Sequence, residues 1–233
     1  MNANRGDRVV MDAGPVGFRG RGGHGHLDAL SFEAWIGGEL AIRDSGTGSY
    51  TGDAALRNEL RGITAHTVVV VDESAYARLG GVDRLWVIEG DSPPQVTQLA
   101  ANGEEQIAVV RQDLPCAAGE AVVERALTLS PGCLRWCDTV HAPNGSVVRH
   151  LLQLPGACEL RRKAIFHPAL IYTGQWPPDA ILEMHACPNS TGYGRCDSAK
   201  RAIVSYRSDG VPATVLWSIC SSHTRLDGCS TDH

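Results

Sequence analysis

Two histidines in a glycine-rich stretch give the clearest chemical signal in this sequence. His24 and His26 lie within Gly22–Asp28, and Asp44 and His66 follow along the chain. The glycines leave the backbone free to aim the two imidazoles, which point to the same side when the stretch is extended. Two imidazoles and one carboxylate with an open fourth position are the usual ligands of zinc with a bound water. Mn²⁺ or another divalent ion fits the same donors.

A predicted β-hairpin brings Asp44 toward the histidine pair. Apolar and polar residues alternate over 30–36, Gly37-Gly38 forms the turn, and 39–43 resumes as the partner strand. The hairpin begins just after His26 and its second strand ends at Asp44. We therefore expect the two side chains to lie side by side.

His66 opens a run of β-branched residues over 67–71, which predicts a strand that starts at the same end of the sheet. Asp28 is a candidate acceptor that orients one of the histidines. On the residues alone, a simpler interpretation is the more frequent one, because histidine pairs are common in loops and an aspartate commonly ends a turn. Both interpretations stay open at this point.

Nearly all of the remaining chain predicts β-strands. Only 54–62 has helix signals, with Asp53 as N-cap. Asn144-Gly145 predicts a two-residue hairpin turn, whereas 174–200, rich in Pro, Gly, Asn and Ser, predicts a long surface loop. Further strands are expected at 85–88, 106–110, 121–129, 134–140, 147–154, 203–206 and 214–220. The predicted fold class is all-β, a layered antiparallel β-sandwich with at most one short helix.

Composition narrows the classes of function. A net charge of −5 and a pI near 6.0 argue against nucleic-acid binding, which needs a basic face. Membrane insertion is not expected, because no apolar run approaches the roughly 18–20 residues that span a bilayer. The N-terminus lacks the apolar segment of a signal peptide. A generic zinc hydrolase is disfavoured, since neither HExxH nor GxSxG is present.

The cysteines give little evidence for a structural metal site. All eight lie at residue 116 or later, and no pair has CxxC spacing. We expect mostly free or buried thiols rather than disulfides.

Three segments, in order, resemble the signature of the heparinase II/III-like C-terminal domain. They are GHGHLDALSFE over 23–33, DSGTGSYTGD over 44–53, and RNELRGITAHTVVVVD over 57–72. The resemblance is close over residues 10–72 and looser at Ser190, Tyr193 and Gly194. In the family an asparagine follows the AH pair, whereas this chain has Thr67 at that position. The supporting hydrogen bond that the asparagine would make is therefore not expected here.

The resemblance implies a two-part architecture and a lyase activity. Residues 1–20 would be an N-terminal remnant or lead-in strand, and residues 21–233 the C-terminal β-sandwich domain, without the α/α-toroid that carries most of the family's catalytic groups. Such enzymes cleave uronic-acid-containing polysaccharides, heparan sulfate-like or alginate-like, by β-elimination in the periplasm or cell envelope. The implied partners are an anionic polysaccharide and a helical toroid domain or subunit.

The resemblance also assigns roles to individual residues. His26, Asp44 and His66 match the family's metal ligands, usually for zinc. His24 matches a residue of the catalytic cleft, and Tyr50 lies in a segment that carries a cleft tyrosine in some relatives.

Arg57 and Arg61 are candidates for binding an anionic sugar, since both would add positive charge near the cleft. The more frequent interpretation places them on the solvated face of a short helix. The competing function is a non-catalytic carbohydrate-binding or structural β module that keeps its metal for stability. That module would bind glycans without turnover, whereas a lyase would release unsaturated products once a helical partner is added.

Overall fold

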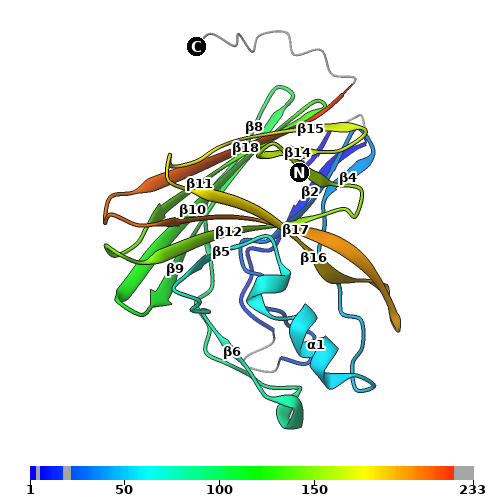
Figure 1. Ribbon diagram of the computed structural model, residues 1–233, viewed down its shortest axis with the longest axis vertical. Helices are drawn as coiled ribbons and strands as arrows, with labels where there is room; N and C mark the ends of the chain where they lie inside the picture. Colours follow the sequence, from blue (N-terminus) through cyan, green and yellow to red (C-terminus); the bar gives the residue numbers. More distant parts are fainter. Residues whose placement is uncertain (4–5, 18–21, 223–233) are drawn as a thin grey trace.

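The computed structural model describes residues 1–3, 6–17 and 22–222, and it consists of antiparallel sheets in layers (Figure 1). The largest sheet has eight strands in the order β13-β14-β15-β18-β11-β10-β9-β8. Their bounds are β8 Gln95–Asn102, β9 Glu105–Cys116, β10 Gly119–Ser130, β11 Cys133–His141, β13 Glu159–Arg161, β14 Ala164–Phe166, β15 Leu170–Gln175 and β18 Ala213–Ser221.

Two four-stranded sheets form the other layer. One runs β1-β2-β3-β4, with bounds Asn2–Ala3, Asp7–Met11, Phe32–Ile36 and Glu39–Ile42. The other runs β16-β17-β12-β5, with bounds Ile181–Gly192, Arg195–Arg207, Val147–Leu154 and Val69–Val71. Their neighbouring strands approach where the N–H of Arg43, just after β4, donates to the carbonyl of Gln153 on β12 at 3.1 Å.

One continuous apolar core joins the layers. Residues of β10, β11 and β18 on one side pack against residues of β3, β12 and β17 on the other. Trp136 is its largest fully buried side chain, with Phe32 edge-on at 5.3 Å and Trp217 stacked at 5.8 Å between ring centroids. Alternating burial along β10 produces this interface, because successive side chains point to opposite faces of a sheet.

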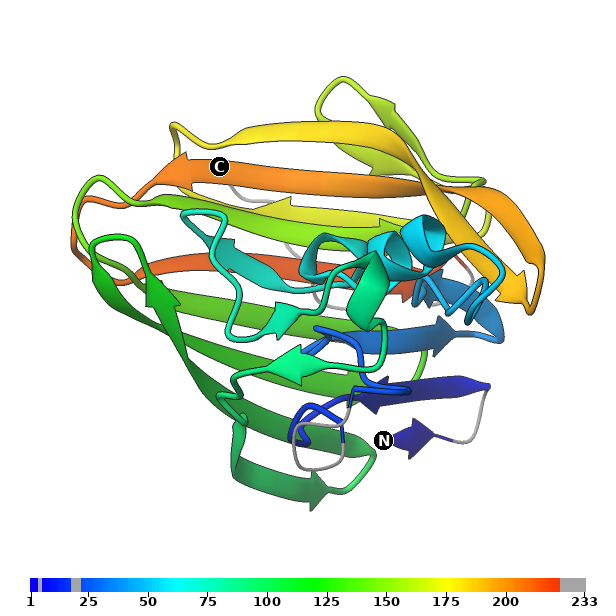
Figure 2. The ribbon, with the colours of Figure 1, turned by 90° about the horizontal axis from the view of Figure 1, so that it is seen from below.

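The helical content is small and lies on one side of the sandwich. Helix α1 (Ala54–Leu60) begins at Asp53, whose side chain accepts from the N–H of Leu56, as the sequence predicted. Two 3-10 turns, η1 (Ile63–Ala65) and η2 (Val82–Arg84), and the small β6–β7 pair (Arg78–Leu79, Ile88–Glu89) accompany it. Figure 2 shows α1 in front of the strands. No described helix is long and apolar enough to cross a lipid bilayer.

The predicted fold class is confirmed, and so is the hairpin that positions the site. Gly37 and Gly38 have φ values of +61° and +87°, the left-handed conformations of a tight turn that fits the twist of the flanking strands. The hairpin pairs Ile36 with Glu39 and Trp35 with Leu40.

The prediction of a long surface loop over 174–200 is wrong. Most of this segment forms β16 and the start of β17, which pair as a long hairpin. Its polar composition resembles a loop because β16 is an edge strand with mostly exposed or half-buried side chains. Pro188 is tolerated there, since an edge strand has one side without a partner.

The Asn144-Gly145 turn exists, but the predicted hairpin does not. Gly145 has φ +87°, whereas β11 pairs with β10 and β18, and β12 pairs with β17 and β5. The turn carries the chain from one layer to the other. A local turn signal cannot distinguish these outcomes, because partner choice depends on distant strands.

The expectation of free or buried thiols holds for five cysteines and is wrong for two. Cys133 and Cys220 form a disulfide between the neighbouring strands β11 and β18. The two cysteines are 87 residues apart in the sequence, so their proximity could not be expected from local patterns. Cys229 lies outside the described residues. The free cysteines are Cys116, Cys137, Cys158, Cys187 and Cys196.

Candidate metal centre and the adjacent cleft

Three side chains meet just beyond the β3–β4 hairpin. One donor atom from each of His26, Asp44 and His66 lies within 4.8 Å of the other two. His66 Nδ1 is 2.6 Å from Asp44 Oδ2, and the ring centroids of His26 and His66 are 5.3 Å apart. The three residues are therefore close enough to share one ion, as expected from the sequence, and their role as metal ligands stays a prediction.

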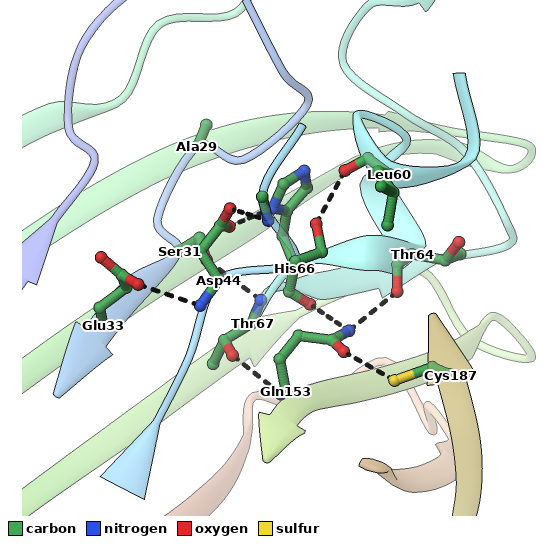
Figure 3. A network of polar contacts seen from close by, with 12 residues as sticks. Ala29, Ser31, Glu33, Asp44, Leu60, Thr64, His66, Thr67, Gln153 and Cys187 are labelled. Carbon is green, nitrogen blue, oxygen red and sulfur yellow. Dashed lines mark hydrogen bonds and ion pairs between the residues drawn. The ribbon is translucent and has the colours of Figure 1, made fainter. Parts of the chain in front are cut away.

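Hydrogen bonds to the backbone hold His66 in place (Figure 3). The side chain of His66 is fully buried. Gln153 donates from Nε2 to the carbonyl oxygens of Thr64 at 3.0 Å and of His66 at 3.4 Å. Thr67, at the position of the family's asparagine, joins this network: its N–H donates to Ser31 Oγ at 3.1 Å, and its hydroxyl accepts from the N–H of Gln153 at 3.0 Å. Threonine therefore makes its own supporting contacts.

The electrostatics of the cluster suit metal binding. Burial, reinforced by the charge of His66, lowers the pKa of His26 to about 4, so its imidazole is neutral at physiological pH. Burial raises the pKa of Asp44, but the hydrogen bond and charge of His66 outweigh burial and leave that pKa below its ordinary value. The Nε2 atom of His66 is buried without a hydrogen-bond partner. Two imidazoles and one carboxylate fit a zinc ion with an open position.

Two arginines near the end of α1 bind the backbone of the loop that contains Gly22 and Gly23. Arg57 and Arg61 both donate from Nη1 to the carbonyl of Leu85, at 2.6 and 2.5 Å. Their Nη2 atoms donate to the carbonyls of Gly23 and Gly22, at 2.6 and 2.9 Å. Both side chains are buried, so the interpretation as a solvated helix face is wrong. Their predicted role in substrate binding remains a prediction, while the contacts place them as supports of the loop that carries the histidines.

Replacing Gly22 with alanine should disturb this loop. An added Cβ would lie 2.2 Å from Ile88 Cγ1 and 2.9 Å from Arg61 Nη2, so the loop or both neighbours must shift. We expect a loss of about 1–3 kcal/mol in the free energy of unfolding, measured in urea, and weaker zinc binding. Gly23→Ala is the matched control, because its nearest contact would be an ordinary 3.5 Å to Trp86. Equal effects of the two substitutions would contradict this account.

The two cleft residues implied by the resemblance lie together. His24 Nδ1 is 3.2 Å from the Tyr50 hydroxyl, and the rings meet edge-on at 5.3 Å between centroids. His24 and His26 line a cavity of about 510 Å³, together with Asp28. Burial raises the pKa of Asp28 to about 6, although His66 lowers it. No hydrogen bond within the described residues joins Asp28 to either histidine, so its expected orienting role is not seen.

Sequence reasoning missed two exposed aromatic residues beside the cleft. Trp86 lies in the segment 85–88, where a strand was expected, and is 49% exposed, with the Arg57 guanidinium 4.6 Å from its ring centroid. Tyr193 is 69% exposed and stacks on Tyr50, with 6.0 Å between ring centroids. The loose resemblance around Tyr193 was the one signal that pointed to it, while nothing in the pattern of 85–88 distinguishes Trp86 from a buried strand residue.

One family model matches nearly the whole chain. The chain matches the family model described as heparinase II/III-like, C-terminal, over residues 1–218. No curated protein sequence matches the chain.

Solved structures show the same fold. A heparinase III gene product superposes with a TM-score of 0.75 at 18% identity, covering 95% of this chain and 34% of that one. The heparan sulfate lyase HepC from Pedobacter heparinus gives a TM-score of 0.70 at 15% identity, covering 92% of this chain and 33% of that one. This chain thus spans about a third of the length of the structures it matches.

Proposed function

Because this chain belongs to the heparinase II/III-like C-terminal family, we propose that it is the metal-binding β domain of a polysaccharide lyase. The lyase would cleave uronic-acid-containing polysaccharides, heparan sulfate-like or alginate-like, by β-elimination, together with a helical toroid domain or subunit. The observation that carries the proposal is the placement of the His24–Tyr50 pair beside the convergent His26, Asp44 and His66.

β-Elimination at a uronic acid needs three functions. The carboxylate must be neutralised, a base must take the C5 proton, and an acid must protonate the leaving O4. In this proposal His24 neutralises the carboxylate or accepts a proton, the two roles that an imidazole can perform in this reaction. The Tyr50 hydroxyl, 3.2 Å from His24 Nδ1, would hold or pass on that proton. The remaining groups would come from the helical partner.

His26, Asp44 and His66 would hold a zinc ion, or another divalent ion such as Mn²⁺. The contribution of this ion would be structural, since β-elimination requires no metal-activated water. When bound, it would fix the loop that carries His24 against the sheet. A neutral His26 and an ionised Asp44 support this assignment. The Cys133–Cys220 disulfide supports a location in the periplasm or cell envelope, where disulfides persist.

Substitution of His24 by alanine tests the catalytic part of the proposal. The zinc-loaded chain is mixed with a separately produced helical domain of the family, and unsaturated uronate ends are followed by ultraviolet absorbance on heparan sulfate and on alginate. We expect His24→Ala to lower kcat/KM by about 10²–10⁴, the usual contribution of a proton-transfer group. His141→Ala, at an exposed histidine on β11, should leave kcat/KM unchanged.

Two results would count against the proposal. One is the absence of unsaturated product from the metal-loaded wild-type mixture on every uronate polymer. The other is equal activity of His24→Ala and wild type. Glycan binding without any cleavage would favour the non-catalytic carbohydrate-binding module instead.

A further inference from the structure

A short hairpin at the edge of the largest sheet projects from the sandwich. Strands β13 and β14 pair at three positions, and Arg162 and Lys163 form the two-residue turn between them. Within the described residues, β14 joins β15 through a single register pair, Phe166 with Ile171, so the tip of the hairpin extends away from the sheet. Figure 1 shows β14 and β15 above strands β12 and β17, with α1 below them. We call residues 159–166 the basic hairpin.

The turn of the basic hairpin has a backbone conformation that is costly for its residues. Arg162 and Lys163 have φ values of +48° and +64°. In this left-handed region the Cβ atom approaches the following carbonyl oxygen, so two-residue turns of this kind strongly favour Asn-Gly. Two long basic side chains at these positions are therefore not explained by the preference of the backbone.

A second turn of the same kind shows how the rest of the chain can offset such a cost. Asp72 and Glu73 have φ values of +52° and +59°. The Asp72 side chain accepts from the Ser146 hydroxyl at 2.9 Å and from the Val147 N–H at 2.8 Å. Glu73 forms an ion pair with Arg149 at 3.2 Å. Within the described residues, the two side chains in the turn of the basic hairpin make no hydrogen bond or ion pair. A strained conformation without an internal partner points to contact with another molecule.

The charge of the basic hairpin indicates an anionic partner. Residues 155–178 contain three basic side chains, those of Arg161, Arg162 and Lys163, whereas the whole chain has a net charge of −5. The one acidic residue in this range is Glu159. Arg161 pairs with Glu159 at 2.7 Å, but both side chains are more than half exposed, so this ion pair contributes little. A local excess of positive charge on an acidic protein favours association with an anionic surface.

Exposed apolar side chains lie on the same face as one of these cations. The guanidinium of Arg161 lies 4.0 Å from the ring centroid of Phe166. Phe166 is directly opposite Ile171 in the register, and the two side chains are 43% and 41% exposed. Opposite residues of neighbouring strands point to the same face of a sheet. This face therefore combines a cation, an aromatic ring and an aliphatic side chain.

Such a combination distinguishes a lipid surface from a soluble polyanion. Basic side chains reach the phosphate groups of lipids, while aromatic and aliphatic side chains enter the boundary with the acyl chains. A sulfated polysaccharide would contact the cations in the same way, but it offers no apolar phase for an exposed isoleucine. The projecting tip also suits an extended surface better than a small molecule, which binds in a concave pocket.

We propose that the basic hairpin docks the protein reversibly on an anionic lipid surface. Arg161, Arg162 and Lys163 contact the phosphate groups, and Phe166 and Ile171 lie at the boundary of the acyl chains. Three cations and two apolar side chains give weak, salt-sensitive binding rather than a permanent anchor.

Docking through this hairpin leaves the cleft accessible. Arg57 of α1 donates to the carbonyl of Gly23, next to His24, and α1 lies on the opposite side of the layers from β14. The cleft therefore faces away from the lipid surface. The inference concerns where the protein resides, and it does not depend on the reaction proposed above.

Co-sedimentation of the chain with lipid vesicles tests the proposal. The probes are vesicles of phosphatidylglycerol mixed with phosphatidylcholine, and vesicles of phosphatidylcholine alone. We expect the wild-type chain to bind the anionic vesicles and to be released from them by high salt, which screens the attraction. Vesicles without net charge should bind the chain much more weakly.

The double variant Arg162→Asn/Lys163→Gly separates charge from backbone strain. It removes two cations and installs the residues that the turn prefers, so the melting temperature should rise. Its binding to the anionic vesicles should fall about 25-fold, since each basic side chain near an anionic surface contributes about 1 kcal/mol, or about fivefold. The matched control is Arg78→Ser/Arg84→Ser, which removes the same charge from two exposed arginines on the side of α1 and should bind like wild type. Phe166→Ala should weaken binding several-fold.

The proposal is overturned if the wild-type chain does not bind the anionic vesicles, or if the double variant of the turn binds them as tightly as wild type. Binding of soluble heparan sulfate through the same turn, without binding to vesicles, also overturns it and identifies a polysaccharide site. Vesicle binding is measured without a helical partner, so these outcomes are independent of the test of lyase activity.

Discussion

Replacing His66 with glutamine is expected to weaken zinc binding by about 100-fold or more. Even residues that only hydrogen-bond to a metal ligand change metal affinity by about 10–100-fold when they are replaced, and His66 is itself a proposed ligand. His66 is fully buried and its Nδ1 faces Asp44 Oδ2, so glutamine removes a ligand without opening the site to water. Loss of the ion also removes its stabilisation of the folded state, which is about 2.7 kcal/mol when free zinc exceeds the dissociation constant 100-fold.

Elemental analysis after dialysis and melting with and without a chelator measure this effect. The matched control is His150→Gln. His150 is also fully buried, with Nδ1 3.2 Å from an aspartate oxygen and Nε2 without a partner. That aspartate, Asp138, is already paired with Arg125, so the control should lose stability without losing zinc. If His66→Gln retained one zinc ion per chain, the assignment of His66 as a zinc ligand would be contradicted.

Breaking the buried ion pair between the neighbouring strands β10 and β11 is the second large effect that we expect. Arg125 donates from Nε and Nη2 to the two oxygens of Asp138, at 2.6 and 2.7 Å, and both side chains are 1% exposed. Its Nη1 donates to the carbonyls of Leu30 and Thr67, both at 2.7 Å. Arg125→Met leaves the buried Asp138 carboxylate without its guanidinium partner and with the longer 3.2 Å contact to His150 Nδ1. This loss should cost about 3–5 kcal/mol of unfolding free energy.

Urea denaturation of both single variants and of the double variant Arg125→Met/Asp138→Leu measures this coupling. The double variant should recover much of the loss, because no uncompensated charge remains. Additive losses would contradict the assignment of the cost to an unpaired charge.

The ion pair also makes stability depend on acidity. Burial raises the pKa of Asp138, but the charge and hydrogen bonds of Arg125 leave it far below its ordinary value. As pH falls below the ordinary carboxylate range, the unfolded chain takes up the proton first, so the stability that Asp138 contributes declines. Asp138→Leu in the double variant should show a weaker acid dependence.

The sequence predicted the parts of the site that depend on local geometry. The Gly37-Gly38 turn fixes the hairpin register, and the register places Asp44 near His26. The position of His66 could be expected only from its place at the start of a strand and from the family resemblance. Burial of Arg57 and Arg61 was missed, because it depends on the carbonyl of Leu85. A strand was expected over 85–88, whereas Leu85 ends the η2 turn and β7 begins only at Ile88.

The β16–β17 hairpin was beyond sequence reasoning for a related reason. Its tip lies against the loop that follows β4, far earlier in the chain, and its composition indicated a loop. Pairing between strands distant in sequence is decided by the packing of the whole sheet. The same limit explains why the Cys133–Cys220 disulfide was not expected.

The proline in β16 has a consequence for the behaviour of the protein at high concentration. A sheet edge normally offers a row of N–H donors on which another chain can form a strand. Pro188 removes one donor, and the register shift between Ser190 and Gly192 bends the strand away from a regular repeat. Both interruptions lie in the outermost strand of its sheet. This edge of the sheet is thus a poor template for the addition of a strand from another copy of the chain.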